Sequence, residues 1–393
     1  MGPEGICQSC GSQGMEVFYE VGAVPVHSVL LMPTQRQALA CRRGDIALAV
    51  CCRCGFVGNL RFDAGLHEYS ERYEETQGFS ATFSAFHREL ARHLVERYDL
   101  RGKTVLEIGC GKGEFLEMLC ELGDNRGVGF DPAYVPGRNP AAASGRTRYV
   151  QDYYSEKYAA CRADLVCCKM TLEHIQETAQ FAGILRRALD DQPQTAVFFM
   201  VPDAGPALRQ AMFWDIYYEH CSYFTAPSLA HLFRSCGFDV LDVQRVYGDQ
   251  YLALEARPAS RWRPAPLPVP EGVEDVLADV ATFARQCPGR LEEWKARLQG
   301  LRRDGRRTVL WGASSRSVSF LTTVQAPGAV DCVVDINPYK HGTFMPGTGE
   351  QIVGPEHLRQ YRPDVVIAMN PIYREEIGRD LSRMGLAPQL LVV

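Results

Sequence analysis

Two pairs of cysteines near the start of the chain have the spacing of metal ligands. Cys7-x2-Cys10 is matched by Cys51-x2-Cys54, and a glycine directly follows each pair. Paired CxxC motifs of this kind typically supply four thiolates to a tetrahedral zinc ion. Cys41 and Cys52 are rival ligands, but they lack the usual spacing. The sequence therefore predicts a structural zinc site at Cys7, Cys10, Cys51 and Cys54, with no open position for catalysis.

A glycine-rich turn joins an apolar strand to a helix in the middle of the chain. Thr104 to Ile108 form the strand, and Gly109, Gly111 and Gly113 follow it at a GxGxG spacing. Glycines there let a ligand approach the backbone closely at the N-terminus of a helix. Glu107 precedes the first glycine by two residues, and this acid favours a methyl donor over a dinucleotide.

Three more polar residues follow at or near the ends of later strands. Asp131 ends the strand Gly127 to Phe130 and can accept hydrogen bonds from both ribose hydroxyls of a nucleoside. Asp152, after the third strand, is placed to meet the adenine amino group. Lys169 directly follows the fourth strand, Asp164 to Cys168. The whole series resembles a class I methyltransferase, and it implies S-adenosylmethionine as cofactor.

The alternation of strands and helices predicts the fold that positions these residues. A helical pattern over Gly78 to Tyr98 precedes the strands. Such alternation is typical of a doubly wound, mainly parallel sheet. A second strand-helix series begins at Thr308 to Trp311 and predicts another Rossmann-like domain. We expect a zinc-binding module at 1–65, a methyltransferase domain at 66–257, a proline-rich linker and helix at 258–300, and a Rossmann-like substrate-binding domain at 301–393.

Composition narrows the class of protein. The chain has 393 residues, of which 46% are hydrophobic and 23% charged, and its formal net charge is -5. This balance is typical of a globular protein and gives no general attraction to phosphate backbones, so we expect no nucleic-acid partner. No apolar run is long enough to span a membrane. The first five residues lack the features of a secretory signal, so we expect a cytoplasmic protein whose 15 cysteines are thiols or metal ligands.

Over nearly its full length the chain resembles the bacterial nucleotide-sugar C-methyltransferases. Three regions carry the resemblance: the cysteine pairs, the segment Trp214 to Phe224 with its Tyr-x-Glu-His motif, and the C-terminal segments Trp311-Gly-Ala-Ser-Ser and Val334 to Gly342. The resemblance implies methylation of a carbon beside a ketone, on a deoxy sugar carried by a nucleoside diphosphate, such as a dTDP-linked 4-keto sugar.

The same resemblance implies a catalytic set. His220 is the expected general base, Tyr217 or Tyr223 the hydrogen-bond donor to the enolate oxygen, and Glu219 an orienting or binding group. Tyr69 and Tyr73 precede the cofactor domain where the family places an active-site tyrosine, and either could serve. His174 is a minor rival as base. His67 and His87 have no evident partner, and we expect them to be exposed or capped.

Four residues of the C-terminal domain lie at expected strand ends or in the loops that follow: Ser314, Asp335, Lys340 and Asn370. Ligands of doubly wound sheets bind there, so we expect these residues and Tyr69 to bind the substrate.

Two departures from the family leave the acceptor open. Pro25-Val-His-Ser28 stands where the family commonly has a Pro-Leu-Ala-Asn type of segment, and Gly248-Asp-Gln250 replaces a loop of small residues. C-methylation, or O- or N-methylation, of another small biosynthetic intermediate is therefore the first alternative. A zinc-containing RNA methyltransferase and a non-catalytic subunit are the alternatives from other classes. The sequence leaves open whether the protein is a monomer or a dimer.

Overall fold

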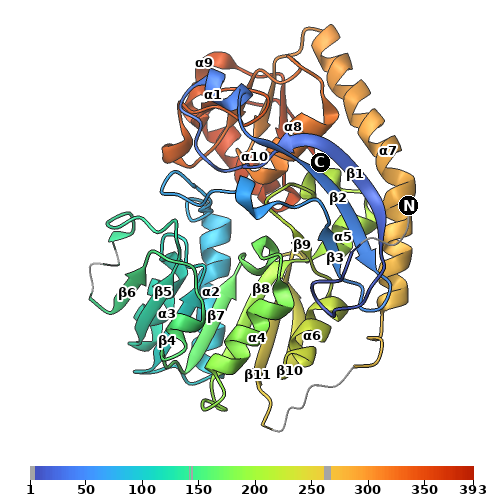
Figure 1. Ribbon diagram of the computed structural model, residues 1–393. Helices are drawn as coiled ribbons and strands as arrows, with labels where there is room; N and C mark the ends of the chain where they lie inside the picture. The colour runs from blue at the N-terminus through green and yellow to red at the C-terminus, as the bar shows by residue number, and fades with distance from the viewer. Residues whose placement is uncertain (1–4, 141, 143–144, 261–266) are drawn as a thin grey trace.

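Three β-sheets organise the part of the chain that the structure describes, residues 5–140, 142, 145–260 and 267–393 of a computed structural model. Figure 1 shows one α/β body below, a second above, and a smaller sheet with a long helix along one side. The expectations for residues 1–4 and for the middle of the proline-rich linker, 261–266, fall outside the described residues.

The central sheet has seven strands and carries the glycine-rich turn. Its order is β10-β11-β8-β7-β4-β5-β6, with β11 antiparallel to both neighbours and β6, β5, β4, β7 and β8 mutually parallel. The strands are β4 (Thr104–Ile108), β5 (Arg126–Phe130), β6 (Thr147–Val150), β7 (Leu165–Lys169), β8 (Ala196–Pro202), β10 (Phe238–Val246) and β11 (Tyr251–Pro258). Every residue of β7 is buried, as expected for a strand covered on both faces.

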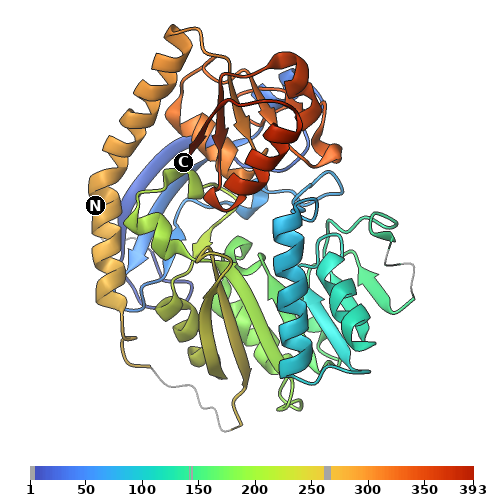
Figure 2. The ribbon, with the colours of Figure 1, turned by 180° about the vertical axis from the view of Figure 1, so that it is seen from behind.

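Helices cover both faces of this sheet. Figure 2 shows α2 (Ala81–Arg97) and α3 (Glu114–Gly123) on one face, and Figure 1 shows α4 (Thr178–Ala188) and α6 (Ala226–Ser235) on the other. Helix α2 begins where the Ser80 side chain accepts a hydrogen bond from the Phe83 N–H, and its buried stripe includes Leu90 and Leu94. The helix expected within Gly78 to Tyr98 is therefore present and packs on the sheet.

The N-terminal sheet is shared between distant parts of the chain. Its antiparallel strands are β1 (Met15–Pro25), β2 (Arg43–Cys51), β3 (Val57–Asn59) and β9 (Ser222–Tyr223), and helix α1 spans Gln35–Leu39. Strand β9 follows His220 by one residue and pairs with β3. The sheet that contains Cys51 thus continues into the segment expected to be catalytic.

The C-terminal body is a five-stranded parallel sheet. Its order is β14-β13-β12-β15-β16. The strands are β12 (Thr308–Trp311), β13 (Cys332–Val334), β14 (Ile352–Val353), β15 (Val365–Ala368) and β16 (Gln389–Val392), with helices α8 (Ser315–Val324), α9 (Leu358–Tyr361) and α10 (Arg374–Arg383). The carboxyl ends of β12, β13 and β15 meet at one edge, where a ligand of such a sheet binds.

The long helix α7 (Val273–Arg303) spans the side of the molecule in Figure 1. Its buried residues include Phe283 and Trp294, which belong to a core shared with the N-terminal sheet, helix α5 (Ala204–Arg209) and the C-terminal body. The described chain also contains short 3-10 helices: η1 (Ala64–Leu66), η3 (Glu156–Tyr158), η4 (Leu172–His174), η5 (Phe213–Asp215), η6 (Pro338–Lys340), η7 (Pro355–His357) and η8 (Pro371–Tyr373). No helix within the described ranges is long and apolar enough to cross a membrane.

Candidate active site

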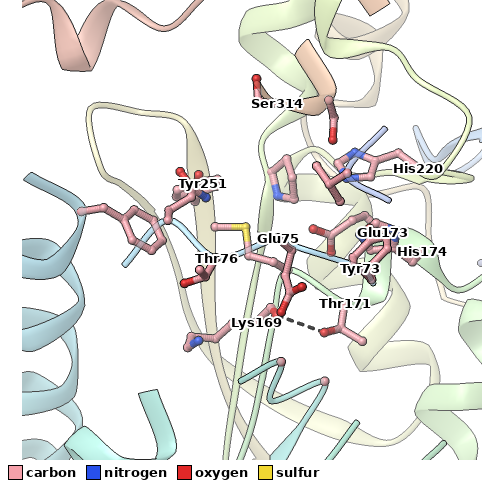
Figure 3. A pocket seen from close by; sticks show the side chains of 18 of the residues that line it. Tyr73, Glu75, Thr76, Lys169, Thr171, Glu173, His174, His220, Tyr251 and Ser314 are labelled. Atoms are coloured by element: carbon pink, nitrogen blue, oxygen red, sulfur yellow. Dashed lines mark hydrogen bonds between the residues drawn. The ribbon is translucent and has the colours of Figure 1, made fainter. Parts of the chain in front are cut away.

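One cavity of about 650 Å³ lies between the central sheet and the C-terminal sheet. Its volume is that of a small-molecule site. The predicted site residues that line it come from three separate parts of the chain: Tyr69, Tyr73, Gly109, Gly111, Asp131, Asp152, Lys169, Tyr217, His220, Tyr223, Ser314, Asp335, Lys340 and Asn370. In Figure 3, His220, His174 and Tyr73 gather on one side of this cavity, with Tyr251 across from them and Lys169 at the end away from Ser314.

The glycine turn is tied to the end of β5 by one carboxylate. Asp131 accepts hydrogen bonds from the N–H groups of Gly111 (2.8 Å) and Ala133 (2.7 Å). Burial raises the pKa of Asp131, and these two backbone bonds oppose that rise. Gly109 has φ of 69°, and a Cβ there would lie 1.9 Å from Thr171 Oγ1. The cradle therefore requires glycine, and Asp131 retains lone pairs for ribose hydroxyls.

Glu107 lies behind this turn. It is 1% exposed, it is not among the residues that line the cavity, and Lys169 Nζ lies 3.1 Å from its Oε1. Burial raises the pKa of Glu107, against the attraction of Lys169. Glu107 thus borders the cavity through Lys169, and its direct contact with a cofactor stays a prediction. Gly113, the third glycine, does not line the cavity either; it caps α3 with φ of 82°.

Asp152 lies at the open rim. Its carboxylate accepts a hydrogen bond from Tyr158 Oη (2.6 Å) and pairs with Lys157, and these contacts lower its pKa. Its role toward adenine stays a prediction.

Glu75 is a site residue that the sequence reasoning missed. Its carboxyl group lines the cavity above the glycine turn, where a Cβ on Gly111 would lie 2.6 Å from Glu75 Oε1. Lys112 Nζ lies 3.6 Å from the other oxygen. Burial raises the pKa of Glu75 to about 7, although Lys112 lowers it. Its closeness to Tyr73 in the sequence was the one available signal.

The expected base lies beside aromatic and histidine rings. His220 is 6% exposed, and its ring centroid is 4.2 Å from that of Tyr217 and 4.8 Å from that of His174. Burial lowers the pKa of His220 well below the usual value, and the neighbouring His174 and Arg316 lower it further. An imidazole in this position is neutral near pH 7 and can accept a proton.

Glu173 was also missed. It is 2% exposed and lines the cavity, and its Oε2 has no hydrogen-bond partner among the described residues. Burial raises its pKa to about 8, so it is mostly a neutral acid at pH 7. Its carboxyl oxygen and ring nitrogens of His174 and His220 all lie within 4.8 Å of one another. Its signal in the sequence was only the neighbouring His174.

The two candidate enolate donors differ in their contacts. Tyr223 Oη accepts a hydrogen bond from the Tyr217 N–H and donates one to the Tyr217 carbonyl, both at 3.2 Å. The Tyr217 hydroxyl makes no hydrogen bond within the described part of the chain, and Tyr217 lines the cavity. Burial raises the pKa of Tyr217 well above its usual value, which keeps the phenol protonated. Tyr217 is therefore free to donate, whereas Tyr223 already supports the backbone.

Two histidines are not exposed as expected. The His67 side chain is 6% exposed, and its Nε2 lies 3.6 Å from Glu219 Oε1. His87 is 8% exposed and packs on Phe83 and Phe115, and burial lowers its pKa to about 2. The expectation was wrong because segments distant in the sequence cover both rings.

The C-terminal sheet repeats the arrangement found at Asp131. Asp335 accepts hydrogen bonds from the N–H groups of Ala313 (2.7 Å) and Asn337 (2.8 Å). Lys340 Nζ donates to the Ala313 carbonyl (2.8 Å) and lies 3.6 Å from Asp335. In both sheets an acid after the second strand thus clamps the turn after the first. Asn370 is held differently, because its side-chain amide exchanges two hydrogen bonds with Gln250.

Arg316, at the start of α8, brings a cation from the C-terminal body into the cavity. Its Nε forms an ion pair with Asp215, and the pair lies close enough to Tyr217 and Tyr251 to influence their pKa values. No sequence signal indicated this arginine.

The four predicted cysteines come together away from the cavity. Cys7 and Cys54 sulfurs are 3.7 Å apart, as are those of Cys10 and Cys51, and all four lie within 4.8 Å of one another. A tetrahedral ion about 2.3 Å from each sulfur would require sulfur separations of about 3.8 Å. The donor set and its dimensions therefore fit zinc, whereas the rivals Cys41 and Cys52 are not part of the cluster.

Two protein families match the chain. Residues 83–243 match the family described as methyltransferase domain, and residues 273–388 match the C-methyltransferase C-terminal domain. The chain is therefore an S-adenosylmethionine-dependent methyltransferase whose C-terminal domain is that of the C-methyltransferases. This result confirms the expected class I methyltransferase fold with a second Rossmann-like domain.

One full-length relative and several solved structures are similar. C-methyltransferase NovU of Streptomyces niveus is 26% identical in an alignment 391 residues long that covers 94% of this chain and 90% of that protein. The 1,6-didemethyltoxoflavin-N1-methyltransferase of Burkholderia thailandensis, solved with S-adenosylhomocysteine, is 20% identical with a TM-score of 0.36, covering 46% of this chain and 81% of that one. A methyltransferase of Aquifex aeolicus is 15% identical with a TM-score of 0.33, covering 42% and 88%.

Proposed function

We propose that the protein methylates a carbon beside a ketone, on a sugar linked to a nucleoside diphosphate, and that His220 is the general base. The observation that carries the proposal is the buried, neutral imidazole of His220 at the cavity wall, next to the unpaired hydroxyl of Tyr217. A carbon beside a ketone becomes a nucleophile only after it loses a proton, so a base and an oxyanion donor are the two groups that the reaction needs.

The proposed proton transfer leaves the net charge of this buried site unchanged. His220 takes the proton from the carbon, and the electron pair of the C–H bond moves into the enolate. The new imidazolium and the enolate then form an ion pair, so the net charge of the site does not change during the transfer. Tyr217 donates to the enolate oxygen, and Arg316, held by Asp215, adds a positive charge nearby. S-adenosylmethionine supplies the methyl group as a sulfonium electrophile.

In this proposal the central sheet binds the cofactor and the C-terminal sheet binds the nucleotide of the acceptor. Asp131 with the glycine turn binds the ribose of the cofactor in the domain that we place at 66–257. Asp335 clamps the corresponding turn in the domain that we place at 301–393. The repeated clamp supports a second ribose at Asp335, that of the acceptor's nucleotide. Ser314 and Lys340 line the cavity on the same side.

We also propose that the cysteine cluster binds one structural zinc ion. With four protein thiolates the ion has no open position, so its role is to hold the turns at Cys7–Cys10 and Cys51–Cys54 together.

The experiment that tests the reaction is product analysis by NMR with a carbon-13 methyl donor and a dTDP-linked 4-keto deoxy sugar. A methyl doublet or singlet on a ring carbon is the expected product. A methyl group on oxygen or nitrogen would refute C-methylation and leave the cofactor site intact.

The role of His220 is tested separately. His220→Asn should lower turnover about 10² to 10⁴-fold, because a positioned base contributes that much, while the affinity for the methyl donor changes little. With the demethylated cofactor product bound, the wild type should exchange the acceptor's proton for solvent deuterium and the variant should not. Wild-type turnover in His220→Asn would place the base elsewhere, with His174 the next candidate.

A further inference from the structure

Glu219 does not line the cavity, although its neighbour His220 does. Its side chain is 2% exposed and lies behind the wall formed by Tyr69, Tyr73 and His174. The titratable side chains close enough to influence its charge, or to be influenced by it, are His27, His67, Tyr69, Tyr73 and His174. Glu219 can therefore affect the reaction only through the residues that surround it.

A chain of two hydroxyls leads from the C-terminal body to Glu219. Ser28 Oγ lies 2.7 Å from Ser315 Oγ and also contacts Glu219 Oε2. A hydroxyl has one proton, and an ionised carboxylate can only accept. The geometry makes Ser28 the donor toward both Glu219 and Ser315, so its one proton serves one acceptor at a time, and the carboxylate is the stronger of the two. The N-terminal segment, the catalytic segment and helix α8 thus meet at one carboxylate.

The second oxygen of Glu219 faces His67. The distance from His67 Nε2 to Glu219 Oε1 is 3.6 Å, and both side chains are almost fully buried. His67 is held by its neighbours, because the rings of Tyr69 and His27 lie 4.4 Å and 4.7 Å from its own. His27 is fixed in turn by a hydrogen bond from the Glu68 N–H to its Nε2 (2.8 Å).

These contacts keep a negative charge inside the protein. Burial alone would raise the pKa of Glu219, but His67, His174 and Ser28 together lower it below the usual value. Burial lowers the pKa of His174 to about 4, and the nearby Glu219 carboxylate and backbone oppose that fall. The ring of His174 faces that of His220 at 4.8 Å, which connects Glu219 to the base.

We propose that Ser28 and His67, both from the N-terminal part of the chain, are positioning residues that hold Glu219 ionised behind His174 and so fix the His174–His220 pair. The fixed carboxylate stabilises the positive charge that arises when His220 accepts the substrate proton. The inference rests on the proposed role of His220 as base. It gives Ser28, in the module expected at 1–65, and His67, just after that module, a part in the reaction.

The test is the dependence of turnover on pH, measured as release of S-adenosylhomocysteine. In His67→Gln the acid limb of kcat should move to higher pH, because Glu219 loses the partner that most lowers its pKa. Below that limb, turnover should fall roughly tenfold per pH unit, as expected for one proton. Ser28→Ala should shift the limb in the same direction, and Ser28→Thr, which keeps the hydroxyl, should restore the wild-type profile.

A double-mutant cycle shows whether these residues act through Glu219. Glu219→Gln removes the ionising group, so adding His67→Gln to it should cause no further change in the pH profile or in kcat. His357→Gln, an exposed histidine of the C-terminal body, is the matched control and should behave as the wild type. Zinc content and melting temperature are measured for every variant.

Two results would overturn the inference. One is an unshifted acid limb in His67→Gln, and the other is an equal loss of turnover at every pH together with a lower melting temperature, which marks a structural role only. Failure of the proposed function would be seen in other measurements: the position of the methyl group in the product, or the deuterium exchange of His220→Asn. The pH profile of turnover is independent of these, because it can be measured whatever atom is methylated.

Discussion

Tyr217 and Tyr223 form a matched pair, because replacing each by phenylalanine removes one hydroxyl but should change a different property of the protein. Tyr217→Phe removes the hydroxyl of a residue that lines the cavity, and this hydroxyl makes no hydrogen bond within the described residues. Tyr223→Phe removes a hydroxyl that accepts from the Tyr217 N–H and donates to its carbonyl. One variant should lose catalysis and the other stability.

The magnitudes follow from these contacts. Loss of one donor to a developing oxyanion costs about 10² to 10³ in kcat, which corresponds to about 2.7 to 4 kcal/mol of transition-state stabilisation. We expect this loss in Tyr217→Phe, with the free energy of unfolding nearly unchanged. In Tyr223→Phe the N–H of Tyr217 loses its partner, which costs about 1 to 3 kcal/mol, whereas the Tyr217 carbonyl keeps the hydrogen bond from the His220 N–H (3.2 Å). Tyr223→Phe should therefore unfold at a lower temperature.

The assay combines steady-state kinetics with thermal unfolding of both variants and the wild type. For a domain of this size, each kcal/mol lost should lower the melting temperature by about 2 to 4 °C. Because the segment of Tyr223 also carries His220, a moderate fall in kcat is compatible with the reasoning for Tyr223→Phe. The assignment of Tyr217 as the donor would be refuted if Tyr217→Phe kept wild-type kcat, or if only Tyr223→Phe lost turnover without losing stability.

Three further predictions concern the binding sites. Metal analysis of the purified protein should find about one zinc ion per chain. Cys54→Ser should lose the metal and, by calorimetry, unfold at a lower temperature. A wild type that is fully stable without metal would contradict this prediction. Asp131→Ala should weaken binding of the methyl donor by about 1.5 to 3 kcal/mol in calorimetry, because charge-assisted hydrogen bonds to ribose are lost, and an unchanged affinity would exclude that contact. Asp335→Ala should raise KM for the nucleotide-linked acceptor while the donor affinity stays at the wild-type value; the reverse pattern would assign the C-terminal clamp to the cofactor.

Local patterns in the sequence were enough to predict the elements of the fold. The strand Thr104–Ile108 has the bounds expected from its apolar residues, and the helix expected within 258–300 is found at Val273–Arg303. The glycine turn and the cysteine pairs are equally local, because their function depends on residues a few positions apart. Asp131 and Asp335 could be found because the ends of parallel strands meet at one edge of a sheet.

The tertiary structure decided which side chains face the cavity. The sequence placed Glu219 beside His220 in the catalytic set, yet its carboxylate lies behind the wall, whereas Glu173 and Arg316, which carried no clear signal, line the cavity. The burial of His67 against Glu219 joins segments more than 150 positions apart. Such contacts depend on how the three sheets pack together, and so do the pKa shifts that follow from burial, because spacing along the chain determines neither the direction of a side chain nor what covers it.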